Sequence, residues 1–125
     1  MTKDNQNLVQ KWIEYSANPK GNEHLFWAWE SVDDAVHDSP EEAWVLILAL
    51  IEEAPNNAIL ADIAAGSLEN LVVYHSEKFI KRIDEMARKS PKFRLCLTGV
   101  WCKGSIPEDH YKIIQLYVST VEKPL

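Results

Sequence analysis

The stretch that decides the fold runs from Ser39 to Pro55 and reads Ser-Pro-Glu-Glu-Ala-Trp-Val-Leu-Ile-Leu-Ala-Leu-Ile-Glu-Glu-Ala-Pro. It opens with a helix start signal, because Ser39 can cap a helix, Pro40 fits the first helical position and Glu42 can reach back to the capping residue. The segment Ala43 to Ile51 is apolar throughout, so its helix needs neighbours on every side. We predict a central helix that ends before Pro55.

Outside this stretch the apolar residues also recur at helical spacing, and no segment alternates as a strand does. Turn and cap residues divide the chain into about seven helices, which we expect to pair as antiparallel hairpins. The residues expected to open the last four helices are Asn56 or Asn57, Ser76, Ser90 and Ser105, in chain order. The inward stripes should contain four tryptophans, namely Trp12, Trp29, Trp44 and Trp101. The sequence therefore predicts an all-α fold with one helical domain over residues 1-125.

A weak internal repeat accompanies this pattern. A shift of 33 residues aligns Leu46 with Phe79 and Gly66 with Gly99. One interpretation is a short superhelical stack of the HEAT or tetratricopeptide (TPR) kind. The other is an irregular bundle whose hairpins align through helical periodicity alone. Gly costs about 1 kcal/mol relative to Ala within a helix, so Gly66 and Gly99 should each permit a close helix crossing or a local break.

Length and composition exclude several classes of protein. The chain has 125 residues, 46% of them hydrophobic, and a formal net charge of -6, as expected of a soluble globular domain. No apolar run approaches the roughly 20 residues of a membrane span, and the polar amino terminus carries no secretory signal. Cys96 and Cys102, six residues apart on one predicted helix, should face different sides and form no disulfide. We expect a cytoplasmic protein of a bacterium or a similar cell, with no membrane partner.

The charges are distributed unevenly along the chain. Residues 21–77 contain twelve acidic residues and no Lys or Arg. Residues 78–103 have the opposite balance, with eight basic residues and two acidic ones. A surface of this kind attracts a basic macromolecule to one end and accelerates the encounter. The pattern therefore indicates a basic protein partner.

The candidate partner-binding site is an acidic patch around one interhelical turn. Its members are Asp33, Asp34, Asp38, Glu41 and Glu42, with help expected from Asp62 and Glu69. Trp27 lies off the apolar stripe of its helix and is a candidate interface anchor. The alternative is that these acids stabilise helix N-termini and keep the protein soluble, with Trp27 partly exposed at a helix edge.

The basic segment allows two further interpretations. The residues that could hold phosphates are Lys78, Lys81, Arg82, Arg88 and Lys89. They lie opposite an apolar stripe as ordinary solvated residues do, and the net charge of -6 opposes nucleic acid. We do not expect nucleic acid binding. The same basic face could instead pair with the acidic segment of a second copy, which would produce a homodimer.

Patterns that carry catalysis or metal binding are missing. The four histidines are scattered along the chain, and Asp33 with His37, the best metal candidate, more simply forms a surface ion pair. No phosphate-binding loop, nucleophile elbow or activated cysteine is present. We therefore expect no enzyme, no metal and no cofactor.

One part of the chain resembles a known family. The motifs are Ile63-Ala64-Ala65-Gly66-Ser67-Leu68-Glu69-Asn70-Leu71, His75, and the ending Leu97-Thr98-Gly99-Val100-Trp101. Over residues of about 40-102 they resemble a small all-helical bacterial family that is catalogued only as a domain of unknown function. The resemblance implies a helical fold and makes Glu69, His75 and Trp101 candidates for a shared polar and aromatic feature. It implies no activity.

A small, acidic, Trp-rich helical protein without a catalytic constellation is expected to be a non-enzymatic protein-binding module. The most specific hypothesis is an immunity protein or antitoxin, a toxin inhibitor that neutralises a basic toxin such as a nuclease through the acidic patch. The alternative is a helical scaffold or adaptor protein that binds a peptide in the concave face of a short stack, or that forms a dimer. This alternative predicts an apolar groove instead of salt-sensitive contacts.

Overall fold

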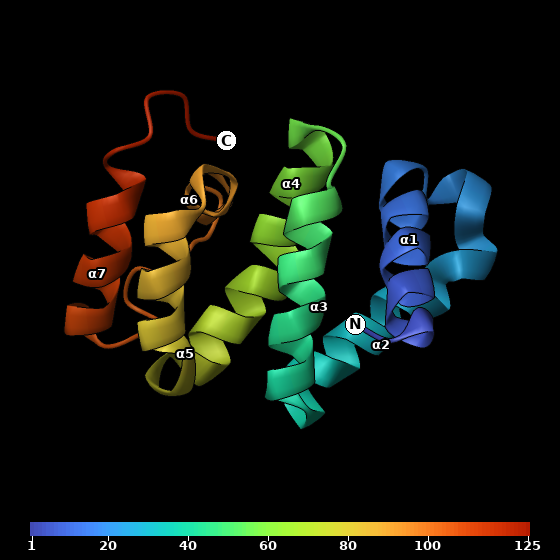
Figure 1. Ribbon diagram of the computed structural model, residues 1–125, viewed down its shortest axis with the longest axis horizontal. Coiled ribbons are helices and arrows are strands. Elements are labelled where there is room, and N and C mark those ends of the chain that lie inside the picture. Colours follow the sequence, from blue (N-terminus) through green and yellow to red (C-terminus); the bar gives the residue numbers. More distant parts are fainter.

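Helices arranged in a row make up the protein, and the predicted all-α class is confirmed. The computed structural model describes residues 1–125, and it places α1 at one end of the long axis and α7 at the other (Figure 1). The elements are α1 (Lys3–Ala17), the 3-10 helix η1 (Lys20–Leu25), α2 (Phe26–Asp38), α3 (Pro40–Glu53), α4 (Asn57–Ile63), the π-helical turn η2 (Ala64–Leu68), α5 (Glu69–Lys89), α6 (Pro91–Leu97) and α7 (Glu108–Val118). None of these helices combines the length and the apolar character that crossing a bilayer requires.

The apolar stretch of the sequence forms α3, which lies at the centre of the molecule. It packs against α1, α2, α4, α5 and α6, whereas α7 packs mainly against α5 and α6. Trp44 of α3 contacts the rings of Phe79 and Phe93, which belong to α5 and α6. The expectation that neighbours cover α3 on every side is wrong, because Val45 is 46% exposed. One buried cluster of 28 side chains, built around α3, forms the core.

The prediction of seven helices is wrong, because the expected fourth and fifth helices are one. The chain continues without a turn from α4 through η2 into α5, which leaves six helices. The predicted start at Ser76 does not cap a helix, since its hydroxyl is buried and lies 3.0 Å from Nδ1 of His110. The backbone kinks at the preceding residue, His75 (φ -135, ψ 26), whose Nε2 donates to the carbonyl of Val36 at 2.7 Å.

Capping residues were predicted with mixed success. Asn56 and Ser90 cap α4 and α6 as expected, accepting from the N–H groups of Ile59 and Phe93. α3 starts at Pro40, but Ser39 makes no side-chain capping bond. Ser105 does not open the last helix, because α7 begins at Glu108, directly after a proline that fixes the entry of the chain.

Several side-chain placements also differ from the prediction. Trp12 and Trp44 are buried, but Trp29 is 37% exposed and Trp101 is 82% exposed. α6 ends at Leu97, so Trp101 and Cys102 lie in the following loop and not on a helix that also carries Cys96. The helical period does not continue into this segment, because Gly99 and Gly104 interrupt regular structure there.

The two glycines play different roles. A Cβ on Gly99 would lie 2.8 Å from Cβ of Ala64, so this residue allows the loop after α6 to approach η2 closely. A Cβ on Gly66 would meet nothing within 4 Å. Gly66 instead lies in the π-helical turn, which is a local break in the regular helix.

Candidate functional site

The predicted partner-binding residues come from four elements. Trp27, Asp33, Asp34 and Asp38 belong to α2, and Glu41 and Glu42 to the first turn of α3. Asp62 lies on α4, and Glu69 is the first residue of α5. α2 buries Ala28, Val32 and Val36, which recur every four residues, so its opposite side is left to solvent.

Glu41 is neutralised within the chain. Arg82 of α5 donates to both of its carboxylate oxygens, at 2.5 and 2.9 Å, and Nζ of Lys78 lies 3.5 Å away. The hydrogen bond from Arg82 holds the pKa of Glu41 below its ordinary value, and Glu41 in turn raises the pKa of Arg82. Glu41 therefore joins α3 to α5 and adds little negative charge to the patch.

Asp62 and Glu69 also have partners within the chain. The hydroxyl of Ser16 on α1 donates to Asp62 at 2.6 Å, which joins α1 to α4. The backbone N–H of Trp101 donates to Glu69 at 2.7 Å. This bond holds the loop after α6 against the start of α5 and brings together two of the three residues that the family resemblance singled out. The third, His75, lies elsewhere, bonded to the last turns of α2.

The remaining members of the patch form no ion pair. Asp33, Asp34, Asp38 and Glu42 have no basic side chain within salt-bridge distance, and all but the half-buried Asp33 are exposed. Trp27, 43% exposed, lies on the same helix. The structure thus leaves four acids and one tryptophan of the predicted site open to a partner. We call Trp27, Asp33, Asp34, Asp38 and Glu42 the α2 surface.

An aromatic cluster beside the α2 surface was missed by the sequence analysis. The rings of Phe26 and Trp29 stack with centroids 5.5 Å apart, and Tyr15 of α1 meets Phe26 edge-on. Phe26 is 41% exposed. Spacing alone could have suggested this, because Phe26, Trp27 and Trp29 span too wide an arc of a helix to face one core together.

The basic residues of the second half mostly hold the fold together. Lys92 donates to the carbonyls of Glu52 and Ala54, both at 2.9 Å, and so satisfies the carboxyl end of α3. Arg94 does the same for α5 by donating to the carbonyl of Ala87 at 2.6 Å. A basic side chain at the carboxyl end of a helix also complements the helix dipole.

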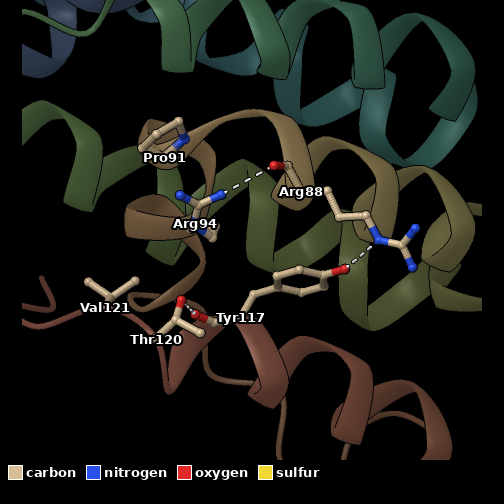
Figure 2. Close-up of a pocket in the computed structure, with 6 residues that line it drawn as sticks. All are labelled: Arg88, Pro91, Arg94, Tyr117, Thr120 and Val121. Carbon is tan, nitrogen blue, oxygen red and sulfur yellow. Dashed lines mark hydrogen bonds between the residues drawn. The ribbon is translucent and has the colours of Figure 1, made fainter.

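Arg88 and Arg94 line a hollow of the surface that has a volume of about 560 Å³. Figure 2 shows Arg88 and Arg94 with Pro91, Tyr117, Thr120 and Val121 around it. Nε of Arg88 donates to the hydroxyl of Tyr117 at 3.0 Å, which raises the pKa of Arg88, and its Nη2 donates to Asp84. Tyr117 in turn donates to Asp84. The carboxylate of Asp84 already compensates this charge, so the hollow is a weak site for an anion.

The side chains considered for metal binding and nucleophilic attack have the following surroundings. No group of three or more His, Cys, Asp or Glu side chains is placed to hold a metal ion. His37, half of the metal candidate, packs edge-on against Tyr74 with centroids 5.0 Å apart. Burial raises the pKa of Cys96 to about 12 and also raises that of Cys102, so both thiols stay protonated and are poor nucleophiles.

The comparisons with known proteins place the chain in a family whose function is unknown. Residues 15–120 match a family of unknown function (DUF6869). No curated protein and no solved structure matches the chain. The family resemblance stated from the motifs is thus confirmed, and the match extends beyond residues 40–102.

Proposed function

Since the chain belongs to DUF6869, a family of unknown function, its relatives supply no activity, and we propose that it is a non-enzymatic module that binds a basic protein through the α2 surface. In the most specific form of this proposal the partner is a toxin, for example a nuclease, and the chain is its cytoplasmic immunity protein or antitoxin in a bacterium. Acidic side chains that cover a basic active site would block access to an anionic substrate.

The observation that carries the proposal is a difference in how the two signs of charge are compensated. In residues 78–103, Lys78, Arg82 and Arg88 form ion pairs, and Lys92 and Arg94 hold helix carbonyls. In residues 21–77, the only acid in an ion pair is Glu41. Five of the eight basic residues in the segment 78–103 are thus engaged within the chain, while eleven of the twelve acids of residues 21–77 form no ion pair, so more of the negative charge is available to another molecule.

The composition of the α2 surface supports the same conclusion. Exposed tryptophans beside acids combine an apolar anchor with charges that steer the partner. Trp27 of this surface is 43% exposed and Trp29 beside it is 37% exposed, although apolar side chains of this size gain most from burial. Helix N-terminal stabilisation explains Glu41 and Glu42 but not Asp34 and Asp38, which lie in the second half of α2.

The test combines capture of the partner with charge reversal. A tagged chain should retain one basic protein from the native cell at low salt and release it as salt rises. Asp33→Lys with Asp34→Lys should weaken that complex about tenfold or more and flatten its salt dependence. The matched control is Glu52→Lys with Glu53→Lys, which makes the same charge change at the end of α3 that lies away from Glu42. It should have a much smaller effect. Unchanged affinity after reversal at Asp33 and Asp34 would refute the placement of the site.

A second candidate is the helical scaffold or adaptor, in which the helices form a HEAT or TPR-like stack. The row of helices in Figure 1 favours it, and so does Leu116 of α7, which is 67% exposed. In this case binding of a peptide, or of a second copy, would bury apolar surface and would change little with salt. Insensitivity of the captured complex to salt, with loss of binding on Leu116→Asp, would favour this function over the first.

A further inference from the structure

A groove beside the α2 surface combines aromatic walls with a carboxylate. It lies where α1, α2 and the α4–η2 segment meet, and it has a volume of about 300 Å³. Its lining consists of Trp12, Tyr15, Ser16, Pro19, Trp29, Asp62, Ala65 and Gly66. The side chain of Asp62 is held at this groove by the hydroxyl of Ser16, which donates to only one of its two carboxylate oxygens.

The π-helical turn shapes the groove. Residues Ala64–Leu68 widen the helix at this point, and Gly66, without a side chain, leaves the space above the turn open. Turns of this kind interrupt the regular hydrogen bonding of the helix, and they often occur at functional sites. The π-helical turn is therefore a candidate for part of a binding site.

A buried hydroxyl without a partner lies next to the groove. Ser67 is 8% exposed, and its Oγ is the one buried side-chain oxygen or nitrogen that forms no hydrogen bond. It lines a small cavity of about 10 Å³ that shares Trp12, Trp29 and Gly66 with the groove and also includes Asp33. A buried polar atom without a partner destabilises the folded chain, so a bond to this hydroxyl would be favourable.

The charges around the groove favour a cation. Asp62 lines the groove and Asp33 the adjoining cavity, while neither hollow is lined by a Lys or an Arg. Trp29 presents its indole, the aromatic ring that binds cations best. An anion would meet two carboxylates here, and no group of side chains is arranged to hold a metal ion.

We propose that this groove receives an arginine side chain of the basic partner, an inference that rests on the proposed function and assigns the anchor of its interface. The planar guanidinium stacks against Trp29 while its N–H groups donate to the free oxygen of Asp62. The hydroxyl of Ser67 lies beyond the groove, in the adjoining cavity of about 10 Å³. A lysine fits less well, because its ammonium group is a compact point charge that does not stack as a planar guanidinium does.

The test uses a small probe and therefore does not need the partner. N-acetyl-arginine amide is titrated into the full chain while the indole N–H signals are followed by NMR. The signals of Trp12 and Trp29 should shift with a dissociation constant on the order of millimolar. N-acetyl-citrulline amide has nearly the same shape without the charge and should leave them in place. Equal shifts with both probes, or no shift with either, would overturn the proposal.

Two variants examine the groove from different sides. Asp62→Asn removes the charge and should weaken binding of the arginine probe at least about fivefold. Gly66→Leu fills the groove at a position where added atoms meet open space, so the fold is kept and binding is lost. The control Glu53→Gln changes an exposed acid outside both hollows and should leave binding unchanged. An Asp62→Asn variant that binds like the parent would refute the site.

The outcomes separate this proposal from the proposed function. If the chain binds the arginine probe as described but captures no basic protein, the proposal for the groove is supported and the proposed function is refuted. If the Gly66→Leu variant captures a basic protein with unchanged affinity, the proposed function is supported and the groove is refuted as the anchor of its interface.

Discussion

Both terminal nitrogens of Arg82 on α5 donate to the carboxylate of Glu41, which lies 41 positions earlier in the chain, in the first turn of α3. The guanidinium also lies over the ring of Phe79, at 4.9 Å from the centroid. This contact links the acidic and basic halves of the chain. It removes one acid from the patch and one arginine from any phosphate-binding face.

The Glu41 contact predicts a specific loss of stability in acid. Because the pKa of Glu41 is lowered from 4.5 in the folded chain, the ion pair stabilises the fold above about pH 4.5, and its contribution is lost as the pH falls through the lowered folded value. Arg82→Gln should therefore flatten the dependence of the unfolding free energy on pH below pH 4.5. Urea denaturation between pH 3 and 7 measures this, with Lys81→Gln, an exposed lysine without an ion pair, as the control.

Arg82 also distinguishes between classes of partner. Arg82→Gln releases the charge of Glu41, so binding of a basic protein should be unchanged or slightly tighter. A phosphate-binding protein would instead lose affinity for nucleic acid in this variant. Electrophoretic mobility of a labelled nucleic acid, measured with the parent and the variant, checks the second case. Retention of nucleic acid that depends on Arg82 would contradict the proposed function.

The two buried serines predict opposite effects on stability. Ser67→Ala removes an oxygen without a partner and improves helix propensity, so it should stabilise the chain by about 1 kcal/mol. Ser76→Ala removes a hydrogen bond to His110 and should destabilise the chain by about 1 kcal/mol. Thermal and urea unfolding of both variants measure the difference. Destabilisation by Ser67→Ala would mean that its hydroxyl has a partner in the free protein.

The two glycines form a second matched pair. Gly99→Ala places a Cβ 2.8 Å from Ala64 and 3.3 Å from Leu125, so η2 and the carboxyl terminus must shift at a cost of about 1–3 kcal/mol. Gly66→Ala meets open space and gains helix propensity of about 1 kcal/mol. Gly66→Ala should raise the melting temperature and Gly99→Ala should lower it. The same sign for both would contradict the packing at η2.

Cys96 predicts the behaviour of the fold in alkali. Its pKa is raised by burial from 9.0 to about 12, so the folded chain keeps the thiol proton over a range in which the unfolded chain loses it. The stability that comes from the neutral thiol is fully present below pH 9 and is lost as the pH rises toward 12. Cys96→Ala should reduce this alkaline loss.

The folded parent should also react with a thiol reagent near pH 8 only as fast as it opens, because Cys96 and Cys102 are both buried.

The candidate site could be predicted only in part. Charge counting singled out Asp33, Asp34, Asp38 and Glu42, which form no ion pair in the structure. It failed for Glu41, Asp62 and Glu69, whose partners Arg82, Ser16 and Trp101 lie far away in the chain. No local pattern encodes such a contact, since it depends on which helix faces which.

The sequence by itself determined the helical class, the central position of α3 and most helix ends, because each follows from local rules. Periodic apolar residues select a helix face, and residues such as Asn56 and Ser90 satisfy free backbone N–H groups within one turn. Only the tertiary structure decided that α4 and α5 form one continuous helix, because Ser76 caps nothing once His110 of α7 packs against it. It alone decided which charges remain free and where the groove at Gly66 opens. Long-range packing sets both, since burial and pairing depend on neighbours that are distant in the sequence.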